Sequence, residues 1–445
     1  MSDDAMVDIG LIDRAMDEMA TGDTGHTGDT GHTGKTGHTG KTGRRDVVIV
    51  GGGLVGLTLA LALVRQGITS HVLDAADPAS QTAEGFDGRA SAISTASWNL
   101  FGNIGLAERL EAFASPITEI AVSDQLKPGE LRFRPAPEEG SLGRMFENRR
   151  LRLALFDAVK DVPEIAYHPN ANVTVRERGD HGVAAVLDDG RRFEGSLMVG
   201  AEGRASPTRD QAGLAIAHWS YRHRAIICGL AHDKPNDGIA WEIFYPAGPF
   251  ALLPMKDDDQ GRHRTALVWT VAEDDAAAWL KLGEKAFLAE AEKRMGGLLG
   301  RLELASPRSS YPLGFHHAPT IIAERLALVG DAAHGIHPIA GQGLNLGLRD
   351  AAALAEVLGE GVRLGLDLGD AELLKRYQQW RGLDDLMVAV ATDGLTWIFG
   401  VPGRAASAIR RLGMGAIERT DPLKRWFMDE ARGVSGKLPE LLQDG

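Results

Sequence analysis

The sequence has one cysteine, an excess of acidic over basic residues and no long apolar run. Its single cysteine, Cys228, cannot form an intramolecular disulfide, and no secretory signal precedes the first structured segment, so a reducing cytoplasm is the expected compartment. The formal net charge of −13 argues against a nucleic-acid-binding surface, which needs a clustered basic face. No apolar run is long enough to span a bilayer, so we expect any membrane contact to be peripheral.

The chain is long enough for more than one domain. Its 445 residues, 44% of them hydrophobic, supply a sizeable core and favour two coupled domains. Residues 1–44 are expected to stand outside both, because the triplet Thr-Gly-x repeats eight times from Thr21 to Arg44 without the proline that holds a collagen-like helix. We predict a disordered tail. Three histidines recur in this repeat, but ordering it around a metal would cost much entropy, so we predict no metal site.

The first structured segment is predicted to begin at Asp46. Residues 47–50 have the pattern of a buried strand, and Gly51, Gly53 and Gly56 follow at once in the spacing G-x-G-x-x-G. A helical pattern comes next. Glycines at these positions form a tight turn and let a backbone approach a pyrophosphate at the helix N-terminus.

An acidic residue completes this unit. Residues 70–73 read as a second strand that ends in Asp74, about twenty residues beyond the glycines, where a carboxylate would accept hydrogen bonds from the ribose hydroxyls of an adenosine. Strand, glycines, helix, strand and acid together predict a dinucleotide-binding unit. The alternative is a tight turn that binds nothing.

A second glycine-dense turn lies within residues 325–354, between an apolar strand and an Ala/Leu-rich helical run. Asp331 at the strand end can accept hydrogen bonds from sugar-type hydroxyls. Gly341 and Gly343 let the backbone approach a flat ligand and direct amide groups, at a helix N-terminus, toward negative charge. The alternative is a turn that is rich in glycine only for steric reasons.

The residues of this turn carry a family resemblance. Residues 337–350, HPIAGQGLNLGLRD, resemble the signature of the ubiquinone-biosynthesis hydroxylases, a branch of the single-component FAD-dependent monooxygenases. The match is continuous, and the resemblance extends from Asp46 to the C-terminus. It implies FAD as the cofactor, NADH or NADPH as the electron donor and O2 as the co-substrate.

The resemblance also implies a fold. We expect an α/β protein with a doubly wound, Rossmann-like FAD-binding domain of the glutathione-reductase type and a substrate domain built on a mainly antiparallel sheet, as in p-hydroxybenzoate hydroxylase. The expected ranges are 45–115, 145–215 and 316–400 for the FAD-binding domain, 116–144 and 216–315 for the substrate domain, and 401–445 for a C-terminal helical region.

Several site residues follow from the resemblance. Arg89 matches an arginine that places the flavin, and Arg152 opens a helix where it can touch a cofactor phosphate; for both, a solvated arginine is the alternative. Glu202 stands where the family usually has an aspartate that assists binding of FAD and the nicotinamide nucleotide. Arg209 is a candidate for the pyrophosphate or a surface arginine. The predicted cofactor-binding residues are Gly51, Gly53, Gly56, Asp74, Arg89, Arg152, Glu202, Asp331, Pro338, Gly341, Gln342, Gly343 and Asn345.

The substrate pocket is expected in the middle of the chain. Phe244, Tyr245 and Pro249 are predicted to form the floor of a flat apolar pocket, although apolar strand residues are more often plain core. His334 and His337 flank the second turn, and we interpret both as packed for structural reasons, so no acid or base is assigned.

The C-terminal segment 404–427 mixes basic and apolar residues. It is compatible with a helix on a membrane surface, and equally with a helix that covers the core.

The predicted function is hydroxylation of the aromatic ring of a polyprenyl-phenol in ubiquinone biosynthesis, in which reduced flavin captures O2 and passes one oxygen atom to the ring. Two alternatives stay open. One is a hydroxylase of a soluble aromatic acid or phenol, and the other is a non-catalytic FAD-binding scaffold in a quinone-biosynthesis complex.

Overall fold

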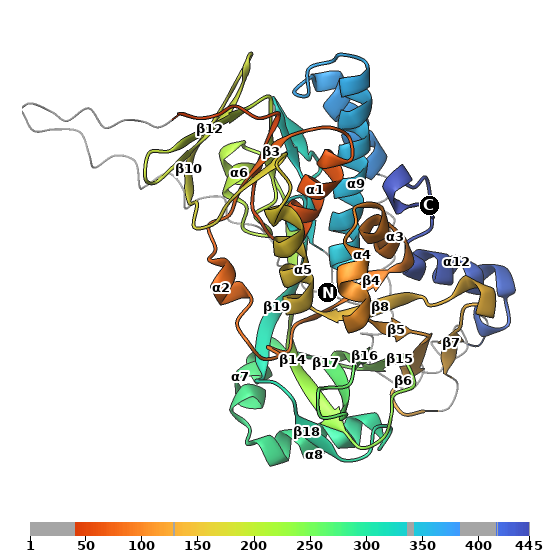
Figure 1. The fold of residues 1–445 in the computed structure, drawn as a ribbon. Helices are drawn as coiled ribbons and strands as arrows, with labels where there is room; N and C mark the ends of the chain where they lie inside the picture. Colours follow the sequence, from red (N-terminus) through yellow and green to blue (C-terminus); the bar gives the residue numbers. More distant parts are fainter. Residues whose placement is uncertain (1–40, 128–129, 336–341, 383–414, 416, 445) are drawn as a thin grey trace, which may run out of the picture. The chain divides into compact units, whose positions relative to one another are not determined.

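The structure is a computed structural model that describes residues 41–127, 130–335, 342–382, 415 and 417–444, all of which belong to one compact unit, Gly40–Gly445 (Figure 1). Most of the predicted tail, the predicted cofactor residues Pro338 and Gly341, and His337 lie outside the described residues.

A six-stranded sheet carries the first glycine turn. Its order is β20-β21-β13-β2-β3-β9, and every neighbouring pair is parallel except β20 with β21. The predicted strands at residues 47–50 and 70–73 are confirmed as β2 and β3. The strands are β2 (Val47–Val50), β3 (Ser70–Leu73), β9 (Ile165–His168), β13 (Leu197–Gly200), β20 (Ile322–Ala323) and β21 (Leu326–Leu328).

Alternate residues of β2 face two different layers, as the period of a strand requires. Val47 and Ile49 pack in the same core cluster as residues of the helices α1 (Leu54–Val64) and α9 (Gln342–Arg363). Val48 and Val50 pack on the other side, against an antiparallel meander. This burial on both faces explains the uninterrupted apolar run Val-Val-Ile-Val. The meander consists of β10 (Val173–Gly179), β11 (Gly182–Leu187) and β12 (Arg192–Gly195), with β1 (Lys41–Thr42) added in parallel to β12.

A nine-stranded sheet forms the other half of the chain, in the order β22-β19-β14-β17-β16-β15-β6-β7, with β18 paired to β14. It is antiparallel apart from the pair β15 and β6. Its strands are β6 (Glu119–Asp124), β7 (Leu131–Phe133), β14 (Ala217–His232), β15 (Ile239–Tyr245), β16 (Gly248–Met255), β17 (His263–Ala272), β18 (Leu302–Leu304), β19 (Ser309–His317) and β22 (His334–Gly335).

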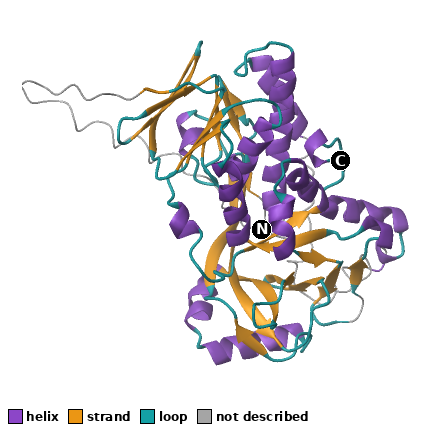
Figure 2. Ribbon diagram, viewed as in Figure 1, coloured by secondary structure: helices purple, strands orange, loops and turns teal. Residues whose placement is uncertain are grey.

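The two faces of this sheet have different coverings. The outer face packs under α7 (Glu273–Lys281) and α8 (Glu284–Met295), where Trp241 and Ile243 join residues of both helices in one core (Figure 2). The inner face carries Phe244, which packs with Phe86 and Ala90. The inner face therefore meets the segment that leads into Arg89 and β4.

A small sheet and short helices connect these layers.

The strand β22 belongs to the large sheet, although residues 334 and 335 fall in a range that we predicted for the FAD-binding domain. The other domain boundaries stay predictions. The remaining elements are β4 (Ala90–Ser94), β5 (Ser115–Ile117), β8 (Gly143–Glu147), α2 (Pro78–Gln81), α3 (Thr95–Asn103), α4 (Ala107–Leu110), η1 (Glu111–Phe113), η2 (Pro137–Glu139), α5 (Asn148–Lys160), α6 (Pro207–Gln211), η3 (Gly330–Ala332), α12 (Asp421–Arg432) and η5 (Glu440–Leu442).

Candidate active site

The first glycine turn is shaped by close approach of two backbones. Gly51 has φ +107, and a Cβ atom there would lie 2.4 Å from the carbonyl oxygen of Ala201. Gly56 is equally confined, because its Cβ would lie 2.0 Å from the carbonyl oxygen of Gly51. Gly53, the N-cap of α1, faces open space instead. The amide end of α1 is thus accessible to an anion.

Asp74 lies beside this turn, at the end of β3. Its side chain is buried; Oδ1 accepts a hydrogen bond from the amide of Ala76 at 3.2 Å, while Oδ2 has no hydrogen-bond partner. Burial raises the pKa of Asp74 above its ordinary value, which the amide of Ala76 opposes. A Cβ on Gly52 would lie 2.9 Å from Oδ2, so the acid and the turn are in contact. A ligand hydroxyl would satisfy this buried acceptor.

Two arginines supply complementary donors. The buried Nε and Nη1 atoms of Arg152, on α5, have no hydrogen-bond partner. Burial, followed by the positive charge of Arg89, lowers the pKa of Arg152. Arg89 itself pairs with Asp87 at 2.5 Å and is half exposed. An anion beside Arg152 would remove the cost of these unpaired donors.

These groups fit FAD. Asp74 offers an acceptor for ribose hydroxyls, and the N-terminus of α1 and Arg152 offer donors to a pyrophosphate. The individual cofactor contacts stay predictions.

The second glycine turn is held by a buried ionic network. Asp350, on α9, accepts hydrogen bonds from the amide of Gly330 at 2.8 Å, from Nε2 of His334 at 2.7 Å and from Nε of Arg381 at 2.5 Å. Burial opposes ionisation of Asp350, but His334 and Arg381 hold its pKa below the ordinary value. The side chain of Asp331 projects beside this anchor and is exposed. Asp331, the predicted acceptor for sugar-type hydroxyls of the cofactor, therefore lies on a rigid support.

The start of α9 is tied to β4. Asn345 accepts a hydrogen bond from the amide of Ser94 and donates one to the carbonyl oxygen of Ala92, both at 2.9 Å. Gln342 donates to the carbonyl oxygen of Ala431 at 3.4 Å, and a Cβ on Gly343 would meet no atom within 4 Å. Of these predicted cofactor residues, Asn345 uses both its side-chain carbonyl and its side-chain amino group in hydrogen bonds within the protein.

Glu202 is likewise engaged by its neighbours. Its carboxylate accepts hydrogen bonds from Ser206 and Thr208 at the start of α6 and pairs with Arg176 at 3.1 Å. The extra methylene relative to aspartate lets the charge reach that helix start. Arg209 is buried and donates to the carbonyl oxygens of Arg204 and Ala332, so it is not the surface arginine of the alternative interpretation.

The predicted pocket floor is partly wrong. Phe244 and Pro249 lie directly opposite each other on β15 and β16, on the inner face. Tyr245, the next residue along the strand, points to the outer face, where its hydroxyl donates to the carbonyl oxygen of Arg294 on α8 at 2.6 Å. Consecutive strand residues cannot line the same pocket because their side chains alternate between faces.

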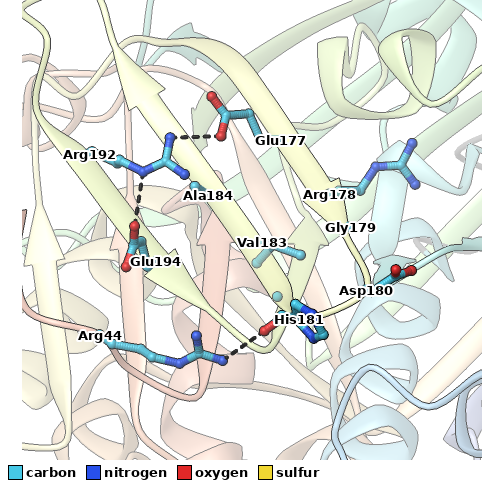
Figure 3. A pocket seen from close by; sticks show the side chains of 11 residues that line it. Arg44, Glu177, Arg178, Gly179, Asp180, His181, Val183, Ala184, Arg192 and Glu194 are labelled. Carbon is cyan, nitrogen blue, oxygen red and sulfur yellow. Dashed lines mark hydrogen bonds and ion pairs between the residues drawn. The ribbon is translucent and has the colours of Figure 1, made fainter.

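A cavity of about 380 Å³ lies elsewhere, on the meander (Figure 3). Arg192 pairs there with Glu177 and Glu194, and Arg44 donates to the carbonyl oxygen of His181. None of the predicted cofactor or substrate residues lines it.

Comparison with known proteins decides the family. A family model described as an FAD binding domain matches residues 44–383. The ubiquinone hydroxylase UbiL of Rhodospirillum rubrum is 44% identical over 395 residues, which cover 89% of this chain and 91% of UbiL. The chain belongs to the ubiquinone-biosynthesis hydroxylase family. The 3-demethoxyubiquinol 3-hydroxylase of Escherichia coli is 31% identical over 391 residues, or 87% of this chain and 98% of that protein.

Solved structures confirm the predicted fold class of this hydroxylase. The p-nitrophenol 4-monooxygenase PnpA of Pseudomonas putida superposes with a TM-score of 0.74 at 20% identity, covering 89% of this chain and 99% of PnpA. HpxO of Klebsiella pneumoniae, complexed with FAD, gives a TM-score of 0.69 at 18% identity, covering 88% and 99%. At these identities the likeness shows the fold alone. The family assignment shows an FAD-dependent aromatic-ring monooxygenase.

The sequence interpretation missed the network of Asp350, His334 and Arg381 as a support for the hydroxylase's flavin turn. One signal was available, since Asp350 directly precedes the apolar run Ala-Ala-Ala-Leu-Ala on α9. Within the described residues, no helix is both long and apolar enough to cross a membrane.

Proposed function

We propose that this hydroxylase adds an oxygen atom to the aromatic ring of a prenylated phenol during ubiquinone biosynthesis. The observation that carries the proposal is the similarity to UbiL along 89% of the chain, which spans both the cofactor turns and the nine-stranded sheet. Retention of the whole nine-stranded sheet, and not of the FAD-binding half alone, favours an enzyme over a scaffold.

The division of labour follows from the site. Bound and reduced FAD activates O2 and supplies the oxygen atom, while NADH or NADPH is the expected electron donor. The chain would bind and orient the cofactor. Asp74 would hold the ribose hydroxyls, and Arg152 and the N-terminus of α1 would hold the phosphates. The turn at Asp331 would support the flavin side of the cofactor. The apolar inner face of the nine-stranded sheet excludes water from the ring.

The test pairs cofactor oxidation with product formation. Purified, FAD-loaded protein is given NADH or NADPH with a short-chain 2-prenylphenol or with unprenylated phenol, and hydroxylated product is measured by mass spectrometry. We expect product with the prenylated ring, in proportion to the nucleotide oxidised. Preference for the unprenylated ring would favour the soluble-phenol enzyme, and FAD binding without product from either would favour the scaffold.

A cellular experiment identifies the ring carbon. Quinone intermediates are profiled in a bacterial strain that lacks its ring hydroxylases, with and without this chain. Restored quinone would support the proposal, and the intermediate that disappears names the position that is hydroxylated. An unchanged intermediate pool, with flavin-loaded protein, donor and partner proteins present, would count against it.

We also propose that the protein works in the cytoplasm, in peripheral contact with the membrane that holds its lipophilic substrate, either directly or within a biosynthetic complex. The helix α12 supports this: Leu423 and Trp426 are 40% and 39% exposed, beside the exposed Arg425. In flotation with anionic vesicles, the wild type should rise with the vesicles, and the double variant Leu423→Ser/Trp426→Ser should stay at the bottom of the gradient. Equal flotation of both would remove α12 from the contact.

A further inference from the structure

A buried tyrosine hydroxyl lies beside the first glycine turn. Tyr167 is on β9, next to Val72 of β3, and its hydroxyl oxygen has no hydrogen-bond partner within the described residues. The sequence gave no reason to assign it a role. A buried hydroxyl without a partner costs free energy unless a ligand supplies one. Tyr167 is therefore a candidate ligand-binding residue.

Tyr167 and Asp74 project from the same face of the six-stranded sheet. Tyr167 lies opposite Val72 in the parallel register, and Asp74 follows Val72 by two residues, so strand alternation gives both side chains one direction. The amide of Asp74 donates to the carbonyl oxygen of His168 at 3.0 Å, which keeps the acid in register with β9. Both residues stand at the carboxyl ends of parallel strands, where open α/β sheets bind ligands.

The glycine turn meets both side chains at one point. A Cβ atom on Gly52 would lie 2.9 Å from Oδ2 of Asp74 and 2.9 Å from Cε2 of Tyr167. The carboxylate and the phenol ring therefore border the same position of the turn, where only glycine fits. A Cβ on the next residue, Gly53, would meet no atom within 4 Å, so the turn is open beside this pair.

The two side chains offer complementary hydrogen-bonding groups. The ring of Tyr167 packs against Phe156 of α5, with the ring centroids 5.6 Å apart. Burial, followed by the negative charges of Asp74 and Asp77, raises the pKa of Tyr167, so its hydroxyl keeps the proton and can donate. Oδ2 of ionised Asp74, which also lacks a hydrogen-bond partner, can only accept. The pair thus presents one donor and one acceptor to a ligand.

We propose that Tyr167 donates a hydrogen bond to the same ribose hydroxyl of FAD whose hydrogen Asp74 accepts. A hydroxyl group is both a donor and an acceptor, so one ribose hydroxyl satisfies both buried groups. A phosphate oxygen would accept from Tyr167 but would be repelled by the carboxylate beside it. The inference rests on the ribose contact proposed for Asp74, and it makes Tyr167 a residue that selects the adenosine half of the cofactor.

The test uses FAD and two FAD analogues, in which the ribose of the adenosine lacks either the 2′- or the 3′-hydroxyl. Each is titrated into FAD-depleted full-length protein, and binding is followed by flavin fluorescence. We expect the wild type to bind one analogue at least about tenfold more weakly than FAD, which identifies the hydroxyl. Tyr167→Phe should bind FAD about fivefold more weakly than the wild type does, but should bind that analogue with unchanged affinity.

A second tyrosine provides the matched control. Tyr245→Phe removes the same atom from the outer face of the nine-stranded sheet, where the hydroxyl bonds to α8, and it should leave all three affinities unchanged. An unchanged FAD affinity in Tyr167→Phe, or equal losses for FAD and the analogue, would overturn the inference. Equal binding of FAD and both analogues by the wild type would instead refute the ribose contact of Asp74, so the two failures are distinguishable.

Urea unfolding separates ligand binding from a structural role. Because the hydroxyl of Tyr167 has no partner in the protein, Tyr167→Phe should unfold at the wild-type urea concentration without FAD, and FAD should stabilise it less than the wild type. If Tyr167 only supported Asp74 by donating to its carboxylate, the variant would be less stable without FAD. Destabilisation of the FAD-depleted variant, or its failure to fold, would overturn the inference.

Discussion

The carboxylate of Asp350 accepts a hydrogen bond from the backbone amide of Gly330, 20 residues earlier in the chain, at 2.8 Å. The same carboxylate binds His334 and Arg381, and all three side chains are buried. The position of the turn that carries Asp331 therefore depends on one charge inside α9.

Replacing Asp350 with alanine should lower the free energy of unfolding by about 3–5 kcal/mol, because it removes the buried carboxylate that pairs with the buried guanidinium of Arg381. Urea unfolding of the apoprotein measures this loss, and flavin absorbance measures the accompanying loss of FAD. The exposed acid Glu303 gives the control, Glu303→Gln, which should change neither. Wild-type stability in Asp350→Ala would contradict the anchoring role.

Replacing Asp74 with alanine should weaken FAD binding by roughly 10- to 100-fold, because a buried acceptor for the cofactor hydroxyls is lost. Asp77→Ala, three residues further along and exposed, is the control. The raised pKa of Asp74 adds a pH signature. An ionised carboxylate accepts hydrogen bonds from hydroxyls more strongly than a protonated one, so we expect wild-type affinity to rise as pH rises through that pKa, and titration of FAD at several pH values should show no such rise in Asp74→Ala.

Tyr245→Phe should lower the free energy of unfolding by about 1 kcal/mol and leave FAD affinity and hydroxylation unchanged. The hydroxyl of Tyr245 bonds to the backbone of α8 on the outer face, away from the cofactor-binding half. Thermal unfolding and product formation, measured on the same preparation, separate the two effects. A selective fall in product formation would restore Tyr245 to the pocket.

The free energy of unfolding should depend on pH through a pair of histidines, His71 and His168. Nδ1 of His71 lies 3.2 Å from Nε2 of His168, and Nε2 of His71 lies 2.7 Å from the carbonyl oxygen of Gly43. Burial, together with the neighbouring His71, lowers the pKa of His168 from 6.5 to about 4. Between these values the unfolded chain binds a proton that the folded chain does not, so stability should fall as the pH falls from 6.5 toward 4.

His168→Gln should reduce this dependence, which urea unfolding at a series of pH values would show as a shallower slope than in the wild type. Parallel slopes in the two proteins would mean that the pair does not contribute. Stability at pH 8 reports any loss of packing against Phe193.

Local patterns were enough to predict the cofactor-binding half. The strand at residues 47–50, the glycine turn and the acid at residue 74 follow one another within thirty residues, and each is specified by its own periodicity or backbone requirement. The large sheet was predicted in type, but Tyr245 was placed on the wrong face, because adjacency in sequence to Phe244 was taken for adjacency in space.

Hydrogen bonds between residues far apart in the chain could not be predicted from the sequence. Arg381 meets Asp350 across 31 residues, and Asn345 meets Ser94 across 251. Neither pair has a spacing that marks it, since the partners lie on different elements and are brought together only by packing. Asn345 was predicted as a cofactor ligand from its place in a motif, and its hydrogen bonds to β4 could not be foreseen from that motif.

The side-chain amide of Asn345 offers β4 one N–H donor and one carbonyl acceptor, as a peptide group of a neighbouring strand would, and it joins β4 where another strand would continue the sheet. These two hydrogen bonds fix the first turns of α9 to β4, the strand that follows Arg89. Any displacement of the helix when a cofactor enters or leaves would pull that strand along with it, so the two sides of the flavin site should shift as one piece and keep their spacing.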